Sequence, residues 1–445
     1  MSAIKLTFSI SIVPEFRQSQ VFFGMATYKP SNSTVFQQFF SPVIEVYSKS
    51  EKQYNCKSIT DLDFLEMGVL RCLSDSQTGR DFIQRHGDHD RLDIDTDLFF
   101  KALKSKRRIT NLGSINRLIK PIVKSRVDDP FKSIPELDGF AIYAADGHFH
   151  AGAVHDEKRA TKKGGERKPA TGHFYITDLR THYISHMGTS DLTNGRKGEH
   201  DMHLIKRSDM NLLRGHEPKG TKVILAWDKA GIDFRFWQKA KTTSGLYFIS
   251  REKENMKLIP CGNIKVDYDD PRNAGVISDE QVGPGSGGAM LRRIVYRDPG
   301  SGEIYTYITT EMTLPPGIIC LLYKQRWDIE KIYDEFKNKL VEKKSWGSGD
   351  ESKITNALFL CLAHNLLLLI EATLTEEGIT NDPEIDRKML RLEEAEKAGT
   401  NFVATFVQRF TVRTLKFIRW LRNFVYRKAS WSQATARLGK AYAQT

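Results

Sequence analysis

Apolar residues recur along the chain with two different periods, and the changes of period divide it into three parts. From about Asp61, apolar residues recur every three to four positions, as on one face of an amphipathic helix. The stretch "DLDFLEMGVLRCL" shows this spacing, and "DTDLFFKALKSKRR" follows with Asp95 or Thr96 as a candidate N-cap. We therefore predict helices within residues 61–130, whereas residues 1–60 have no pattern that assigns them a structure.

After Pro130, short runs of apolar and β-branched residues predict strands instead. "GFAIYAAD" (Gly139–Asp146) and "TKVILAWD" (Thr221–Asp228) each predict a buried strand that ends in an acid. Between them, "GHFYITDLRTHYISHM" predicts one or two more strands, and residues 199–212 predict a helix. This order of elements indicates an α/β domain.

A second group of strands follows in "GLYFISRE", "LRRIVYR" and "EIYTYITT". The last two flank the turn sequence "DPGSG", so we predict a β-hairpin there. "VGPGSGGAM" (Val282–Met290) is rich in glycine but lacks the Lys-Ser/Thr ending of a phosphate-binding loop, and we predict a flexible linker. Together these stretches predict a β-rich insertion at about residues 240–316.

Helical spacing returns at Ile318. We predict helices over Ile318–Glu342 and Ser352–Leu374, and the apolar residues of the last stretch, 401–445, also recur at helical spacing. The fold class that results is an α/β core over residues 131–375, with helical regions on both sides, residues 61–130 and 376–445.

The composition adds a candidate partner. With 40% hydrophobic and 27% charged residues over 445 positions, the chain can bury a core. The formal net charge of +12 favours a polyanion, above all nucleic acid. Lys101–Arg126 holds nine Lys or Arg and no acid, and so does 401–445. For the first of these runs the sequence leaves a solvated helix face and a DNA contact equally open.

Cysteine usage and targeting signals indicate the compartment. The five cysteines lie far apart, with no CxxC pair or zinc-finger spacing, as is typical of reduced thiols in a cytosolic protein. The N-terminal stretch lacks the apolar core of a signal peptide, and the most apolar run, Ala357–Ile370, is too short to span a bilayer. We expect a cytoplasmic protein with no membrane partner.

Two aspartates are candidates for chemistry because each ends a predicted strand. Asp146 and Asp228 would lie where the loops of an α/β sheet open the backbone to a ligand. Considered alone, either one is more often a turn residue or a helix cap.

A helix face supplies a third candidate. Tyr323, Arg326, Glu330 and Lys337 fall within about 60° of one another on a helix, and Asp334 lies at the edge of that face. The ordinary interpretation is a surface face with an Arg326–Glu330 ion pair, worth a few tenths of a kcal/mol. Two strand-terminal aspartates followed by a helical carboxylate, however, match a two-metal phosphoryl-transfer site, whose hard oxygen ligands suit Mg²⁺.

Other residues compete for these roles. Asp233 follows the second strand closely and is a weaker candidate ligand. His148, His150 and His155 could indicate zinc, but their spacing supplies no fourth ligand, so solvated or DNA-facing histidines are expected. Trp327 is expected in the core.

Two more tryptophans, Trp237 and Trp346, could each stack on a flipped base, and the sequence does not choose between them.

At the helix face the sequence resembles a known family. The spacing Tyr323-x2-Arg326-x3-Glu330-x6-Lys337 is the complete YREK signature of bacterial insertion-sequence DDE transposases of the IS-four family. It selects Glu330 over Asp334. The lead-in "LYKQRWDIE" and the preceding "YTYITT" are also similar to that family.

The two aspartates extend the resemblance. "AADGH", with Asp146, resembles the family's Asp-Gly motif, and "ILAWDKAGID", with Asp228, resembles its strand-Asp-x-x-Gly motif. His148 stands where the family often has Thr or Ser. The motifs occur in the family's order, and the resemblance covers about Leu98 to Ile370.

The resemblance implies a ribonuclease H-like core that cuts and joins transposon ends. It assigns the catalytic, metal-binding triad for Mg²⁺ or Mn²⁺, with two ions, to Asp146, Asp228 and Glu330. It assigns DNA contacts near the cleaved end to Tyr323, Arg326 and Lys337. It also implies double-stranded DNA partners (terminal inverted repeats and target), a homodimer with the C-terminal helices as candidate interface, and a nucleoid-associated place in the bacterial cytoplasm. Two alternatives are a catalytically silent DNA-binding regulator and another ribonuclease H-like nuclease.

Overall fold

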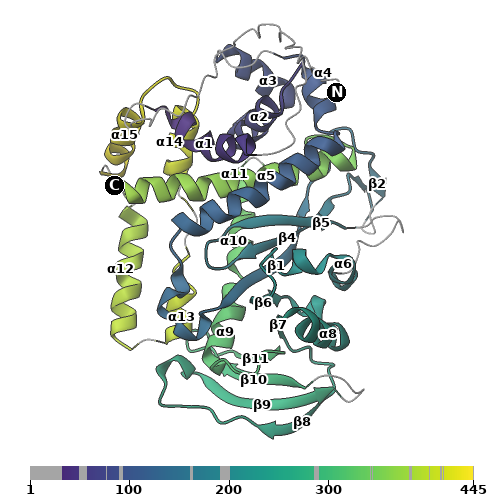
Figure 1. Ribbon diagram of the computed structural model, residues 1–445, viewed down its shortest axis with the longest axis vertical. Coiled ribbons are helices and arrows are strands. Elements are labelled where there is room, and N and C mark those ends of the chain that lie inside the picture. The colour runs from purple at the N-terminus through teal and green to yellow at the C-terminus, as the bar shows by residue number, and fades with distance from the viewer. Residues whose placement is uncertain are drawn as a thin grey trace, which may run out of the picture.

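A nine-stranded mixed sheet runs from the middle of the protein to the end formed by β8 and β9, with helices against both faces of its central part (Figure 1). The computed structural model describes residues 33–49, 58–76, 78–89, 94–160, 164–190, 201–284, 290–340, 342, 344–379, 383–399, 401–410, 413 and 415–443. The strands stand in the order β5-β4-β1-β6-β7-β11-β10-β9-β8. Their bounds are β1 Phe140–His150, β4 Thr171–Asp178, β5 Ile184–Thr189, β6 Lys222–Trp227, β7 Leu246–Arg251, β8 Leu258–Asn263, β9 Val276–Pro284, β10 Leu291–Arg297 and β11 Ile304–Thr309, and a separate two-stranded sheet joins β2 Arg159–Ala160 to β3 Glu166–Arg167.

The centre of the sheet is parallel and buried on both faces. β6 lies between β1 and β7 and pairs in parallel with both, whereas β4 and β5 continue from β1 as an antiparallel meander. Successive residues of β1 enter opposite cores: Ile142 packs with Ile224 on one face, and Ala141 with Val223 on the other. A strand covered on both faces needs an uninterrupted apolar run, which "AIYAA" and "VILAW" provide. The two predicted buried strands are therefore confirmed.

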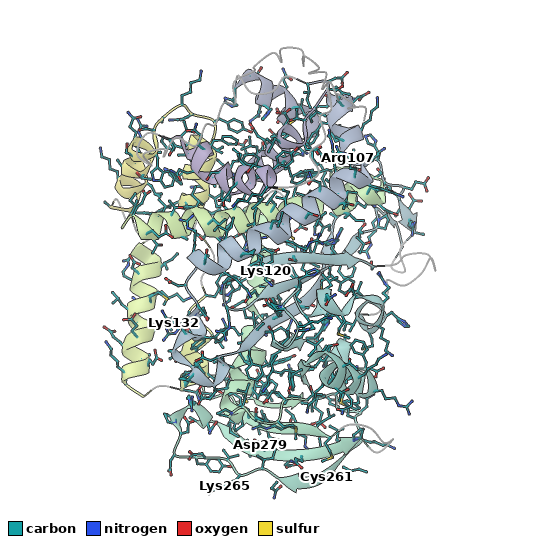
Figure 2. The ribbon with its side chains drawn as sticks, viewed as in Figure 1. Arg107, Lys120, Lys132, Cys261, Lys265 and Asp279 are labelled. Carbon is teal, nitrogen blue, oxygen red and sulfur yellow. The ribbon has the colours of Figure 1, made fainter. Side chains whose placement is uncertain are left out.

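The other half of the sheet is antiparallel and corresponds to the predicted β-rich insertion. β7 pairs with β11, and β11, β10, β9 and β8 follow in antiparallel order, so the predicted β10–β11 hairpin is confirmed. β8 and β9 were not predicted. The linker prediction is wrong for residues 282–284, which belong to β9, and residues 285–289 lie outside the described part of the chain. A buried bidentate ion pair between Arg292 and Asp279, with N···O distances of 2.8 and 2.5 Å, joins β9 to β10 (Asp279 is labelled in Figure 2).

The helices occur mainly before and after the sheet. They are α1 Val35–Ser48, α2 Asp61–Leu73, α3 Gly79–Asp88, α4 Thr96–Ala102, α5 Lys106–Arg126, α6 Asp201–Arg207, α7 Met210–Leu213, α8 Phe234–Ser244, α9 Pro316–Gln325, α10 Asp328–Asn338, α11 Asp350–Glu376, α12 Pro383–Lys397, α13 Phe402–Phe406, α14 Leu415–Phe424 and α15 Trp431–Ala443, with short 3₁₀ turns at Pro130–Ser133, Pro135–Leu137, Lys229–Gly231 and Pro271–Asn273. The predicted helix at "DLDFLEMGVLRCL" coincides with α2, and Asp95 is the N-cap of α4. In the unassigned N-terminal segment, α1 is a helix and residues 1–32 lie outside the described residues.

α11 is the central helix of the helical layer. It lies beside α5, between the sheet and the N-terminal helices (Figure 1). Asn116 of α5 donates to the Leu358 carbonyl of α11 at 3.2 Å, and Asn365 of α11 bonds both backbone groups of Ile184 in β5 at 3.0 Å. α11 is long and apolar enough to cross a membrane by length and composition alone, but 89% of its most apolar window is buried inside the protein, as in a core helix.

Two predicted helices are interrupted. The helix predicted over Ile318–Glu342 is two helices, α9 and α10, because the backbone at Arg326 and Trp327 makes tighter i→i−3 hydrogen bonds, and it ends at Asn338. The helix predicted over 199–212 is also two, α6 and α7, because Asp209 caps a new helix by accepting a hydrogen bond from the Asn211 amide.

The basic run Lys101–Arg126 is largely paired within the protein. Arg107 of α5 makes a bidentate ion pair with the buried Asp61 of α2, at 2.5 and 2.7 Å. Lys120 donates to Glu217, to the Tyr143 hydroxyl and to a backbone carbonyl (Arg107 and Lys120 are labelled in Figure 2). Arg108, Lys124 and Arg126 likewise contact acceptors from other elements. The acids missing from the run thus come from distant segments, and DNA contact by this run stays a prediction.

Candidate functional site

Asp146 and Asp228 lie at the same level of neighbouring strands. The parallel pairing of β1 with β6 ends at Ala145 and Trp227, and each aspartate is the next residue. The expectation that the strand ends at Asp146 is wrong, because β4 continues to pair with β1 as far as His150. On the side of β6, however, the sheet opens at this level. Both carboxylates are partly exposed there, as expected for groups that can meet a ligand.

Arg326 connects this edge of the sheet to Glu330. Its guanidinium donates to the Asp146 carboxylate at 3.0 Å and to the Glu330 carboxylate at 3.1 Å. The Arg326 side chain is 8% exposed, whereas those of Asp146 and Glu330 are 21% and 33% exposed. The buried Arg326 guanidinium thus brings together two of the predicted acids, one on β1 and one on α10. Arg326 and Asp146 are 180 residues apart in the sequence.

The three carboxylates influence one another electrostatically. Burial raises the pKa of Asp146 to about 6, the nearby Arg326 opposes the rise, and the negative charges of Glu330 and Asp228 add to it. Burial works against the charged form of Arg326, but the acids and Tyr323 around it hold its pKa above the usual value. The site therefore carries more negative charge than Arg326 alone neutralises, which favours an added cation.

Tyr333 of α10 holds the helix against β1. Its hydroxyl donates to the backbone carbonyl of Asp146 at 2.9 Å, and its ring stacks on His148 at 4.5 Å with an interplanar angle of 14°. These contacts set how far Glu330, one turn earlier on α10, stands from β1. Sequence reasoning missed Tyr333, because nothing in its local spacing distinguishes it from any buried aromatic residue.

The remaining residues of the predicted helix face differ in exposure. Tyr323 is 4% exposed, and its ring packs on that of Tyr307 with centroids 5.0 Å apart. The Arg326 guanidinium lies over the Tyr323 ring, 5.8 Å from its centroid. Lys337 is exposed. Trp327 was expected in the core, and this is wrong: it lies in the turn between α9 and α10 and is 56% exposed.

The two tryptophans considered for base stacking lie in the core instead. Trp237 is fully buried and donates to the Gly231 carbonyl at 3.1 Å. Trp346 is 8% exposed and stacks on Phe359 at 5.7 Å.

The competing acids have structural partners. Asp233 caps α8 by accepting from the Phe236 amide at 2.9 Å and pairs with Lys206. Asp334 is exposed and accepts from Asn338 at 2.6 Å. Asp328 and Glu335 are fully buried in ion-paired networks away from the strand edge. Of the acids of α10, Glu330 is thus the one that reaches Arg326.

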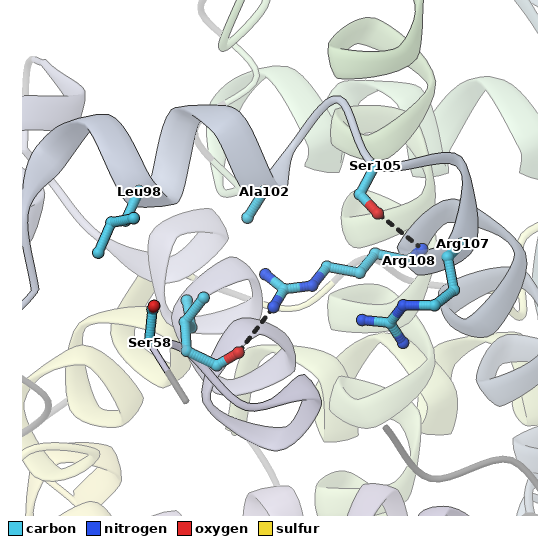
Figure 3. A pocket seen from close by; sticks show the side chains of 7 residues that line it. Ser58, Leu98, Ala102, Ser105, Arg107 and Arg108 are labelled. Atoms are coloured by element: carbon cyan, nitrogen blue, oxygen red, sulfur yellow. Dashed lines mark hydrogen bonds between the residues drawn. The ribbon is translucent and has the colours of Figure 1, made fainter. Parts of the chain in front are cut away.

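A separate open pocket of about 420 Å³ lies between α4, the start of α5 and the segment before α2 (Figure 3). Its lining residues are Ser58, Ile59, Leu98, Ala102, Ser105, Arg107 and Arg108. The Arg108 guanidinium already donates to the Ile59 carbonyl at 2.7 Å. None of the predicted site residues lines this pocket.

The fold and the acids together define a class: mixed α/β domains with two aspartates at the end of the pairing between adjacent parallel strands, and a glutamate brought to them by a helix. The chain belongs to the transposase DDE domain family, whose sequence model matches residues 131–366.

The chain is also similar to one curated relative and to one solved structure. The chain is 30% identical over 145 residues to a protein of Sinorhizobium fredii named "Putative transposase y4zB", a match that covers 31% of this chain and 40% of that relative. Among solved structures, a piggyBac transposase synaptic complex with hairpin DNA is similar over 88% of this chain and 84% of that one, with 12% identity and a TM-score of 0.41.

Proposed function

We propose that this protein is a DNA transposase of the YREK, IS-four type that cuts the ends of its element and joins them to target DNA. The observation that carries the proposal is the convergence of Asp146 and Asp228, side by side at the end of the β1–β6 pairing, with Glu330, which shares Arg326 with Asp146. These are the three acids that the family's motifs select, and they come from three separate segments of the chain.

The strand arrangement supports a ribonuclease H-like core. An antiparallel meander, β1-β4-β5, is continued on the other side of β1 by the parallel strands β6 and β7. The acids stand where β1 and β6 part. The β-rich insertion extends the same sheet beyond β7, so it enlarges the core on the side away from β1.

The donor set fits a hard divalent cation. Asp146, Asp228 and Glu330 offer partly exposed carboxylate oxygens, the ligand type that Mg²⁺ prefers, and only Arg326 among the neighbouring described cations pairs with two of them. In the proposed site these residues would hold two Mg²⁺ or Mn²⁺ ions, which supply charge stabilisation for phosphodiester cleavage. Arg326 would then move from the carboxylates towards a DNA phosphate. It would lose its ion pairs with Asp146 and Glu330 and gain one or more contacts with phosphate.

The proposed DNA contacts rest on exposure and charge. The exposed Lys337 is free to approach a phosphate near the Glu330 face. Tyr323 lies below Arg326, so in this proposal its ring positions the guanidinium against the DNA end. We further propose that the protein acts as a homodimer that bridges two inverted repeats, and that it is associated with the nucleoid in the bacterial cytoplasm.

A strand-joining assay tests the proposed function against its two alternatives. The full chain, pre-cleaved end DNA with a free 3′-OH, target plasmid and Mg²⁺ should yield a covalently joined product. End binding without cleavage or joining would indicate a silent regulator, and cleavage without joining would indicate a nuclease. Either outcome would overturn the proposal.

We expect the affinity of the acidic site for Mn²⁺ to fall about tenfold per unit as the pH drops below about 6. Asp146 must be ionised to hold a cation, and burial raises its pKa to about 6, so protons compete with the metal in that range. In the metal-free protein, the contribution of Asp146 to stability is fully present below its unfolded pKa of 3.8 and is lost as the pH rises through about 6. Calorimetric Mn²⁺ titrations across the range measure the effect. Asp334→Asn should keep the profile, and a flat profile in the parent would contradict it.

A further inference from the structure

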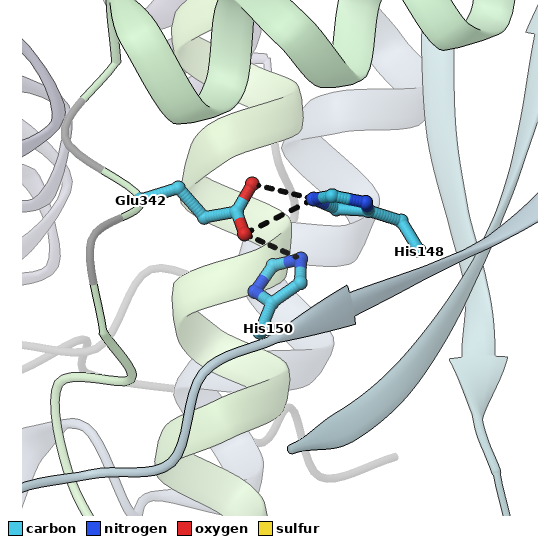
Figure 4. A group of neighbouring side chains, drawn as sticks. All are labelled: His148, His150 and Glu342. Atoms are coloured by element: carbon cyan, nitrogen blue, oxygen red, sulfur yellow. Dashed lines mark hydrogen bonds and ion pairs between the residues drawn. The ribbon is translucent and has the colours of Figure 1, made fainter.

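A second group of metal-binding side chains lies next to the acidic site but is separate from it. His148 and His150 follow Asp146 on β1, and Glu342 follows α10 (Figure 4). The His148 Nε2 atom is 2.8 and 3.0 Å from the two Glu342 oxygens, and the His150 Nε2 atom is 4.0 Å from Oε1. One ligand atom from each of the three lies within 4.8 Å of the others.

The group is closed to solvent. His148, His150 and Glu342 are 6%, 1% and 4% exposed. His150 is the most deeply buried of the three. Its Nδ1 atom has no hydrogen-bond partner among the described residues, and Nε2 meets only the Tyr175 hydroxyl at 2.7 Å and the distant Glu342 oxygen.

We propose that His148, His150 and Glu342 form a structural site for a transition-metal ion of the zinc class, distinct from the Mg²⁺ site proposed for the three acids. Two imidazoles and one carboxylate are a recurrent ligand set for Zn²⁺, with water or the second carboxylate oxygen in the fourth position. Mg²⁺ does not compete well for it, because Mg²⁺ requires oxygen ligands. The two sites therefore differ in the chemistry of their donors.

The distances fit this assignment. Tetrahedral ligands about 2.0–2.1 Å from a metal lie about 3.3 Å from one another. The His148–Glu342 separation is 2.8–3.0 Å and the His150–Glu342 separation is 4.0 Å, on either side of that value, and no two of the three donor atoms are more than 4.8 Å apart. Small side-chain movements would bring the three donors into the geometry of a zinc site.

A metal at this place would fix the two elements that carry the acids. It would join β1, four residues beyond Asp146, to the segment that follows α10. Tyr333 already stacks on His148 and donates to the Asp146 carbonyl. The bound ion would therefore hold Asp146 and α10 at a constant separation, and His148 and His150 would act as positioning residues.

Metal binding by the full chain tests this proposal without any DNA or activity. After dialysis with Zn²⁺, the parent should retain about one zinc per chain, and Co²⁺ should give the visible absorption of a tetrahedral site. Loss of a residue that only supports a metal ligand weakens metal binding by about 10- to 100-fold. Glu342→Gln and His150→Gln each remove a ligand itself, so each should weaken zinc binding by at least that much. The exposed His155 supplies the matched control, and His155→Gln should bind as the parent does.

A double variant distinguishes the proposed zinc site from the acidic site. Asp146→Asn combined with Glu330→Gln should keep its zinc and its Co²⁺ spectrum, although it would fail every joining assay. Zinc that is lost in this double variant but kept in Glu342→Gln would overturn the proposal, and so would a parent that binds no zinc. The Co²⁺ spectrum of the parent still tests for a tetrahedral metal site if the Glu342 variant does not fold.

Discussion

Glu330→Gln should reduce Mg²⁺-dependent cleavage of end DNA by about 10³-fold or more, because metal-held charge stabilisation contributes several kcal/mol to phosphoryl transfer. The substitution keeps the size of the side chain and removes one of the three charges at the edge of β1 and β6. The folded state should change little, because the Glu330 side chain is 33% exposed and its ion pair with Arg326 is worth less than about 1 kcal/mol. Single-turnover cleavage measures the loss.

The matched control lies one turn further along the same helix. Asp334 is exposed, accepts a hydrogen bond from Asn338, and makes no contact with Arg326. Asp334→Asn should cleave at close to the parental rate. If the two variants were equally active, or if Asp334→Asn were the inactive one, Glu330 would not be the third acid.

Glu335→Gln should lower the free energy of unfolding by about 3 kcal/mol, at the lower end of the range for breaking a buried ion pair. Glu335 is fully buried and accepts from Arg413 at 2.6 Å and from His364 at 2.8 Å. Its loss leaves the Arg413 guanidinium in the core, where Glu371, at 2.8 Å, still offsets part of the charge. Urea denaturation measures the change, and Glu330→Gln serves as the control that should leave stability nearly intact.

The pH dependence of stability offers a second test of Glu335. Burial alone would raise its pKa, but Arg413 and His364 outweigh burial and lower the pKa to about 2. A carboxyl group with a lowered pKa contributes its stabilisation above its unfolded value of 4.5, and loses it as the pH falls towards 2. The Glu335→Gln variant should lack this acid-dependent loss. Identical acid-unfolding curves would mean that Glu335 is not the stabilising carboxylate.

The neighbouring acids Glu330 and Glu335 show how far a helical pattern can be interpreted. Residue spacing alone places Glu330 on the face of Tyr323, Arg326 and Lys337, and the structure confirms that Arg326 and Glu330 meet. The same spacing does not reveal that Tyr323 lies in the core or that Trp327 is exposed. The directions of these two side chains depend on the tightened turn between α9 and α10, which no local sequence pattern predicts.

Charge patterns were less informative than apolar ones. The basic run of α5 contains no acid, yet Arg107 pairs with Asp61, 46 residues away, and Lys120 with Glu217, 97 residues away. Counting charges within a segment therefore overestimates the positive surface, because ion pairs form across elements. Strand β9 escaped prediction for a related reason, because a buried Asp279 is not expected from the sequence unless Arg292 lies beside it. Strand β8 is mostly exposed and has no alternating apolar pattern.

The sequence by itself determined the division into helical and strand-rich regions, the two central buried strands with Asp146 and Asp228 beside them, and the candidate Glu330. These depend on local periodicity and on residues adjacent in the chain, which a linear pattern records. Only the tertiary structure decided which acids face the site, how Arg326 links them, and that His148 and His150 meet Glu342 beside Tyr333. Such contacts join residues up to 194 positions apart, and their geometry exists only when β1 and α10 pack together.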